Sequence, residues 1–295
     1  MSPTPVIRPI TDDDVEVCAA LAWEAISAYI PVEFRSDADT EQAAERARAR
    51  MRRFLATDPG GCWTAELDGR PVATALALRR EGVWGLSLFG VAPGLQAQGI
   101  GRRVLDAALT HADGCHGGII ASTLDPRAMR RYALAGFALQ PAFAACGIVD
   151  RHAAPDPATL RARETTWDDP ALRAAARDVS RDVRGASHAD DLDGLALYGG
   201  VPVVLDGEGW AVRDADGSPT VLAARTPAAA QDLLWSCLLG GISGATVHVD
   251  FLTGAQQWAY EVVLAARLPL SPDGAVFTRG RTGPMSPYLP SGVFL

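Results

Sequence analysis

Lysine is missing from this sequence: all 27 basic residues among its 295 are arginine, while alanine is abundant. We interpret this bias as the codon usage of a GC-rich, bacterial genome and not as chemistry. Basic charge is also in deficit, because 35 acidic residues leave a net charge of −8. Binding to nucleic acid requires a basic surface, so we expect no nucleic-acid partner. A negative protein is compatible with a cationic substrate such as an amine.

Potential metal ligands are few and scattered. The five cysteines lack metal-binding spacing, and isolated thiols in odd number are typical of a reduced cytoplasmic protein. Most of the histidines stand alone in the sequence, so we expect no metal site. No apolar run reaches membrane-spanning length, and the acidic start, MSPTPVIRPITDDDVE, lacks the apolar region of a signal peptide. We therefore expect a cytoplasmic protein with no membrane partner.

The length suits two domains of about 150 residues each, and a hydrophobic content of 48% is enough for a substantial core. The stretch RHAAPDPATL at residues 151–160 contains prolines and no periodic pattern, which is typical of a linker. We therefore predict a first domain over residues 1–150, a linker over 151–160 and a second domain over 161–295.

The first half reads as alternating strands and helices. Asp68-Gly69 between two apolar runs predicts a β-hairpin, and Asp125-Pro126 predicts a capped helix start, with Gly136 after its end. Apolar residues at helical spacing predict the remaining helices. Strands are expected at residues 5–10, 62–67, 71–78, 83–91, 119–124 and 137–149, and helices at 12–29, 40–56, 102–112 and from 126.

The second half partly repeats this order. A strand at 220–224 leads to a helix capped by Thr226, and a strand at 247–252 leads to a helix that Thr253 caps. This repetition indicates an ancient duplication. The tail at residues 280–295 ends in apolar and aromatic residues, whereas disordered tails are polar. We predict that it packs back on the fold and lines the cleft between the halves.

The loop Gln96-Ala97-Gln98-Gly99-Ile100-Gly101 lies between a predicted strand and a predicted helix. Glycines there let successive N–H groups point into one concavity, and the helix start adds partial positive charge. A pyrophosphate is the natural ligand of such a loop. The spacing differs from both the Rossmann motif and the P-loop. The second half has only Arg225 and Thr226 at the matching position, which leaves no room for such a loop.

This loop resembles the Q/R-x-x-G-x-G/A signature of the GNAT superfamily of acyl-CoA-dependent N-acetyltransferases, here after a Val91-Ala92-Pro93 corner. The segment from Asp125 to Phe137 resembles the same family's N-x-x-A-x-x-x-Y-x-x-x-G-F stretch. The resemblance covers about residues 5–150. It implies an α/β (α+β) fold of two tandem GNAT-like domains, each a mixed central sheet flanked by helices, of which the second is degenerate and has lost its cofactor site.

The resemblance also assigns roles to residues. The backbone of Phe89 and Val91 is expected to pair with the pantetheine arm of acetyl-CoA, with no metal involved. Two residues depart from the family pattern: Ala97 replaces a frequent glycine, and Gln98 replaces a frequent arginine, for which Arg102 and Arg103 compensate. The residues expected to wrap the pyrophosphate are Gln96, Ala97, Gln98, Gly99, Ile100, Gly101 and Arg102.

Tyr132 is the candidate general acid, because a phenol can protonate the departing CoA thiolate; the alternative is an aromatic that only packs. Asp125 is expected to act as a helix cap. The strand at 83–91 contains no acid, so the base is open: Glu81 and the substrate-side Glu33 are candidates, as are a water chain and an acceptor that arrives deprotonated.

His188 and Asp191 form the most polar cluster of the second half. Their spacing places both on one face of a helix. We expect either a substrate contact or proton relay through His188, or a surface helix start with ordinary caps.

The sequence therefore predicts an acyltransferase that moves acetyl directly from acetyl-CoA to a small-molecule or peptide amine in a ternary complex. The second half is expected to help form the substrate cleft, because pockets favour domain interfaces. The alternative is a non-catalytic protein that binds or senses acyl-CoA. The acceptor, the acyl chain preference and the oligomeric state are open.

Overall fold

The computed structural model describes residues 4–27, 29 and 40–295. Its strands are β1 Val6–Pro9, β2 Cys62–Leu67, β3 Arg70–Arg80, β4 Val83–Val91, β5 Gly117–Ser122, β6 Ala138–Ile148, β7 Arg163–Glu164, β8 Val201–Leu205, β9 Gly209–Arg213, β10 Pro219–Ala224, β11 Thr246–Thr253, β12 Leu270–Gly280 and β13 Tyr288–Leu289. Its α-helices are α1 Val15–Ser27, α2 Thr40–Thr57, α3 Ile100–Leu109, α4 Pro126–Leu134, α5 Pro170–Arg184, α6 Leu192–Leu197, α7 Pro227–Gly240 and α8 Gln257–Ala265.

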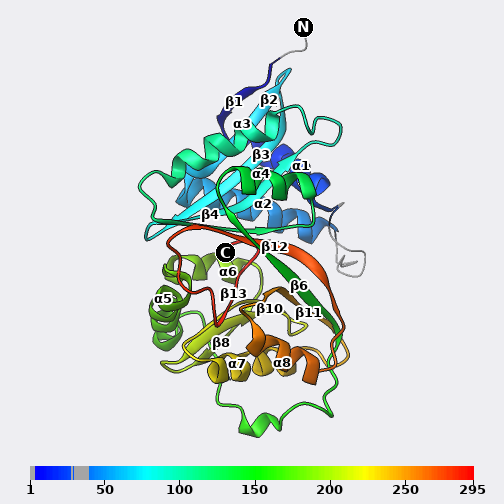
Figure 1. Ribbon diagram of the computed structural model, residues 1–295, viewed down its shortest axis with the longest axis vertical. Helices are drawn as coiled ribbons and strands as arrows, with labels where there is room; N and C mark the ends of the chain where they lie inside the picture. Colours follow the sequence, from blue (N-terminus) through cyan, green and yellow to red (C-terminus); the bar gives the residue numbers. More distant parts are fainter. Residues whose placement is uncertain (1–3, 28, 30–39) are drawn as a thin grey trace.

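The strands form two sheets, and the predicted mixed α/β class is confirmed. An eight-stranded sheet has the order β1-β2-β3-β4-β5-β12-β6-β11, and a five-stranded sheet has the order β13-β10-β9-β8-β7. The larger sheet is mixed, because β4 and β5 pair in parallel while their other neighbours are antiparallel. The two sheets lie one above the other in Figure 1, and the carboxyl terminus lies between them.

The β2–β3 hairpin follows directly from the sequence. Asp68 and Gly69 both adopt positive φ, which the predicted Asp-Gly turn requires. Successive side chains of β3 point to opposite faces of the sheet. Leu76 and Leu78 pack into the core under α1 and α2, while Ala75 and Ala77 join the opposite cluster that contains α3.

The halves of the chain exchange strands. β12, from the second half, lies between β5 and β6 and pairs with both, and β11 pairs with the far side of β6. Figure 1 shows β6, β11 and β12 running side by side where the halves meet. One hydrophobic cluster also continues across this junction, from Leu76 of β3 through Val179 of α5 to Trp210 of β9. The two halves therefore share a sheet and a core.

Helix caps were predicted with mixed success. Asp125 accepts from the backbone N–H of Arg127 at the start of α4, and Thr226 accepts from that of Ala229 at the start of α7, as expected. The prediction that Thr253 caps a helix is wrong. Helix α8 starts at Gln257 with Gln256 as its N-cap residue, because β11 continues through Thr253.

Candidate active site

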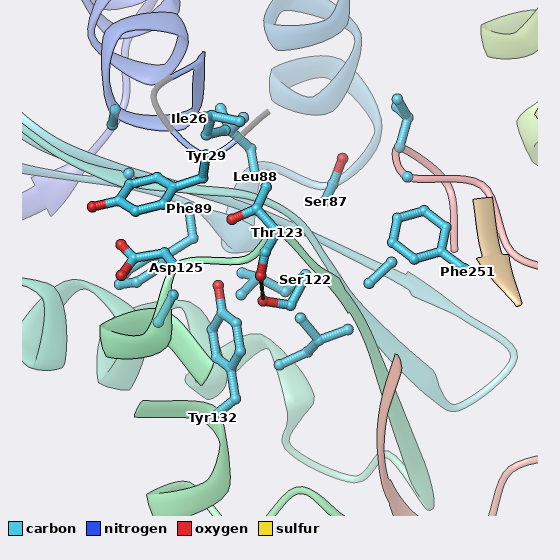
Figure 2. Close-up of a pocket in the computed structure, with 18 of the residues that line it drawn as sticks. Ile26, Tyr29, Ser87, Leu88, Phe89, Ser122, Thr123, Asp125, Tyr132 and Phe251 are labelled. Atoms are coloured by element: carbon cyan, nitrogen blue, oxygen red, sulfur yellow. Dashed lines mark hydrogen bonds between the residues drawn. The ribbon is translucent and has the colours of Figure 1, made fainter. Parts of the chain in front are cut away.

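A cavity of about 890 Å³ opens where β4 and β5 separate. Their parallel pairing ends at Leu86 and Ile120, although β4 continues to Val91. The backbone of Ser87–Val91 therefore faces the cavity on one side and that of Ala121–Thr123 on the other. Figure 2 shows residues of β4, of the segment after β5 and of α4 around the same space. Segments of the second half close its other side.

The predicted loop lines one end of this cavity. Gln96, Ala97, Gly99 and Gly101 face it, and Gly99 caps α3 with a left-handed φ of 82°. The free N–H groups of the first turn of α3 are therefore available to an anion. Ile100 is buried in the core instead and is 4% exposed. This end of the cavity has the backbone that a pyrophosphate needs.

Ala97 adopts a φ of 62°, a left-handed conformation that costs any residue with a Cβ atom. Gln98 does not line the cavity, and its side-chain amide donates to the carbonyl of Gly94. A Cβ added at Gly101 would lie 3.1 Å from both Phe89 and Val91, so the glycine lets α3 approach the end of β4.

Arginines surround the loop end of the cavity. Arg102 lines it and is exposed, whereas Arg103 does not line it and donates to the carbonyl of Pro5. Arg127, Arg130 and Arg131 of α4 also line it, and they were not predicted. Nε of Arg131 is buried without a hydrogen-bond partner in the described chain. The signal that could have identified these arginines is their position within two turns of the Asp125 cap.

Tyr132 lies in α4 between two aromatic rings. Its ring meets Phe89 edge-on at 6.0 Å and Phe277 at 5.5 Å, so packing accounts for its position. Its hydroxyl points into the cavity in Figure 2 and forms no hydrogen bond with the residues that the structure describes. Burial, with a smaller effect of Asp125, raises the pKa of the phenol, which therefore stays protonated at neutral pH. Both expectations for Tyr132, packing and access to the site, are compatible with this geometry.

The wall beside β5 is shaped by a bulge in β4. Leu86 and Leu88 pair with consecutive residues of β3, which leaves Ser87 as the extra residue. Arg50 of α2 lines the cavity here, and it donates both to the Ser87 carbonyl and to the Ser87 hydroxyl. Arg50 forms no ion pair within residues 4–27, 29 and 40–295. Burial lowers the pKa of its guanidinium.

The second half contributes an acidic wall that the sequence reasoning missed. Asp214 follows β9, Asp250 lies in β11 and Asp273 lies in β12, and all three line the cavity. Their positions are far apart in the sequence and carry no motif, so only the exchange of strands brings them together. His248 of β11 lies beside them, and burial lowers its pKa.

The carboxyl-terminal tail packs as predicted. Phe294 and Leu295 are 1% and 0% exposed, and the ring of Phe294 stacks on Phe54 at 6.2 Å. Residues 289–293 line the cavity on the side of the second half. The prediction that the tail lines the cleft is confirmed.

His188 is not brought to the cavity. It is fully buried, so its interpretation as a surface helix start is wrong. Its Nδ1 contacts Asp191 at 2.9 Å and its Nε2 contacts the Tyr288 hydroxyl at 2.7 Å. Burial lowers the pKa of His188 to about 4, so Nδ1–H donates to the charged Asp191, and Nε2 accepts from Tyr288.

Glu81, one of the two predicted bases, does not line the cavity. Glu81 is bound by Arg181 at 2.5 Å and accepts from the N–H of Ser187, outside the cavity lining. Arg181 lowers the pKa of Glu81, which makes it a weaker proton acceptor. Glu33 lies outside the described residues.

The sequence model of the acetyltransferase (GNAT) family matches residues 23–137, which include β4, the loop, α3 and Tyr132. The chain carries a GNAT acetyltransferase domain. Members of this family are acyltransferases, and the cavity lies on the domain's β4, loop and α4. No curated protein sequence matches the chain.

Solved structures resemble the chain over nearly its full length. A Pyrococcus horikoshii protein provisionally named an acetyltransferase has a TM-score of 0.76 at 16% identity, over 99% of this chain and 96% of its own. A GCN5-related N-acetyltransferase from Sphaerobacter thermophilus has a TM-score of 0.56 at 17% identity, over 96% and 98%. A GCN5-related N-acetyltransferase from Kribbella flavida has a TM-score of 0.56 at 15% identity, over 94% of this chain and 72% of its own. The fold of this chain, with both its halves, therefore resembles that of these three proteins.

The described residues include no helix that is long and apolar enough to cross a bilayer. They also contain no group of three or more histidine, cysteine, aspartate or glutamate side chains arranged to hold a metal ion.

Proposed function

We propose that this protein transfers the acetyl group of acetyl-CoA directly to an amine acceptor in a ternary complex. The observation that carries the proposal is the continuity of one cavity, which joins the loop at Gln96–Gly101 to the Tyr132 hydroxyl and to the second half. Two ligands that must react need one continuous space. Holding them together makes the reaction effectively unimolecular.

The residues present fit acetyl-CoA. The N–H groups at the start of α3 and the side chain of Arg102 would hold the pyrophosphate, and the unpaired Arg131 guanidinium is placed for another phosphate. The separated edge of β4 at Phe89 and Val91 offers backbone groups to the amides of the pantetheine arm. When bound, acetyl-CoA supplies an acetyl thioester that an amine can attack.

Tyr132 is the proposed general acid. Its protonated hydroxyl is free of protein partners and faces the cavity, so it can donate to the thiolate sulfur that leaves. N–H groups on the free edge of β4 would stabilise the oxyanion that forms on the thioester carbonyl. The first half thus binds and activates acetyl-CoA, and the second half walls the acceptor side.

Two measurements test this function. Acetyl-CoA is expected to raise the thermal stability of the protein, by about 2.7 kcal/mol at a hundredfold excess over Kd. A panel of amines with acetyl-CoA should then release free thiol in a time-dependent reaction. A protein that only binds or senses acyl-CoA would give the stabilisation without thiol release. Absence of any stabilisation at millimolar acetyl-CoA would contradict both readings.

A further inference from the structure

The cavity has two ends of opposite charge. Arg102, Arg127, Arg130 and Arg131 line the end beside the loop, where an anionic cofactor fits. Asp214, Asp250 and Asp273 line the end formed by the second half. No group of three or more histidine, cysteine, aspartate or glutamate side chains among the described residues is arranged to hold a metal ion. An organic ligand that carries positive charge would complement the acidic end.

The three carboxylates of this acidic end are not equivalent. Asp273 accepts from the N–H groups of Phe251 and Gly274, and Asp214 accepts from three successive N–H groups in its own turn. The carboxyl group of Asp250 makes no hydrogen bond or ion pair with any described residue. Two of the aspartates are therefore held by the backbone, and the third is free to bind a ligand.

A bulge in β11 turns Asp250 toward the cavity. The pairing of β11 with β6 shifts between Val249 and Leu252, and Phe251 within the shift adopts a left-handed φ of 58°. Such a conformation is costly for a bulky residue. It is held by the hydrogen bond from the Phe251 N–H to Asp273. Figure 2 shows Phe251 at the side of the pocket opposite α4.

We propose that Asp250 is the acceptor-binding carboxylate of this enzyme, which pairs with the ammonium group of a cationic amine and takes the proton that the nitrogen must lose before attack. This proposal rests on the proposed function, since it names the class of acceptor and the residue that receives it. The acceptor is expected to carry positive charge, as an alkyl amine or polyamine does.

The charges around Asp250 suit both roles. Asp273 from β12 and Asp214 from the turn after β9 face it, His248 precedes it on β11, and Arg50 of α2 lines the same cavity. Asp250 is exposed to solvent where it lines the cavity, so a ligand can reach its carboxyl group. Reduced hydration, with smaller effects of Asp273 and Asp214, raises its pKa to about 7. A carboxylate with such a pKa is a stronger base than an ordinary aspartate.

The proton and electron balance is simple. The ammonium nitrogen gives a proton to the Asp250 carboxylate, and its freed electron pair forms the bond to the thioester carbonyl carbon. The carbon–sulfur bond breaks, and Tyr132 protonates the departing thiolate. The nitrogen loses its second proton, which restores Tyr132 through water, and Asp250 releases its proton to solvent. The products are an amide, free CoA and one proton.

Binding tests the acceptor class without requiring turnover. 1,5-Diaminopentane and spermidine would be titrated calorimetrically into the protein, with and without CoA, beside the neutral 1,5-pentanediol. The amines are expected to bind and the diol is not. Asp250→Asn should weaken amine binding at least tenfold, Asp250→Glu should restore part of it, and the exposed Asp216→Asn should change it less than twofold.

The outcomes separate this proposal from the proposed function. Amines that do not bind, or that bind Asp250→Asn as tightly as the wild type, overturn the proposal, even where CoA binding and circular dichroism are normal. If the wild-type protein does not bind CoA, the proposed function is contradicted instead. For any amine that is acetylated, kcat/KM should rise with pH through an inflection near 7 that Asp250→Asn lacks. If the inflection persists in the variant, Asp250 does not take the proton.

Discussion

Nε of Arg80, on β3 of the first half, donates to Oδ1 of Asp191 in the second half at 2.8 Å. The same guanidinium binds Asp58 at 2.9 Å, and Asp191 in turn accepts from His188, which accepts from Tyr288. Every member of this chain of contacts is buried, and Arg80 is the most exposed of them at 8%. A buried polar network thus joins the end of α2, the central sheet and the carboxyl-terminal segment.

Removal of Arg80 is predicted to destabilise the protein strongly. Arg80→Ala leaves the buried carboxylates of Asp58 and Asp191 without their cation, which costs about 3–5 kcal/mol. Urea unfolding measures the change. The exposed pair of Arg181 and Glu81 provides the control, because Arg181→Ala should cost less than about 1 kcal/mol. Equal losses in the two variants would contradict a structural role for the buried network.

The same network predicts how stability depends on pH. The folded pKa of His188 is lowered to about 4, below the value of 6.5 for a free side chain. The contribution of neutral His188 to the free energy of unfolding is therefore complete above pH 6.5. It is lost as pH falls toward 4, by up to about 3 kcal/mol. Melting temperatures of the wild type and His188→Gln, measured between pH 7.5 and 4, should converge at acidic pH. A constant difference between the two would contradict the neutral state of His188.

Tyr132→Phe is predicted to lower kcat by about 100-fold or more, because the substitution removes the proposed proton donor and little else. The ring contacts with Phe89 and Phe277 persist, so the affinity for CoA should stay within twofold of the wild type. Thiol release with an acetylated amine gives the rate. Tyr260→Phe is the matched control, since its hydroxyl donates to the Leu252 carbonyl outside the cavity. Unchanged turnover in Tyr132→Phe would show that another group protonates the thiolate.

Ala97→Gly is predicted to stabilise the protein. The left-handed φ of 62° strains an alanine and not a glycine, and the relief is on the order of 1 kcal/mol. Ala92, in the same connection but without positive φ, is the control, because glycine there should destabilise by about 0.5–1 kcal/mol. Thermal unfolding distinguishes the two. A destabilised Ala97→Gly would mean that chain entropy outweighs the strain.

Local signals accounted for much of the first half. The Asp68-Gly69 turn, the bounds of β4 and the Asp125 cap each depend on neighbours within a few residues, and each is found where it was expected. The same kind of signal at Asp169-Pro170 went unrecognised, although it starts α5 in the same way.

What could not be predicted depends on contacts between distant residues. Nothing near His188 in the sequence indicates that Arg80 compensates the charge of Asp191, so the cluster resembled a surface helix start. The acidic end of the cavity has the same origin, because Asp214, Asp250 and Asp273 converge only when β11 and β12 join the larger sheet. Such pairings leave no local periodicity.

The position of β12 also has a consequence for biosynthesis. A ribosome delivers β5 and β6 long before residues 270–280, yet β12 lies between them in the finished sheet. The nascent first half therefore has no partner for the facing edges of β5 and β6 until translation is nearly complete. The sheet of the first half therefore cannot be completed during synthesis until β12 has emerged. A protein released early, or split after residue 150, would expose two unsatisfied strand edges, which are the kind of surface that aggregates or recruits chaperones.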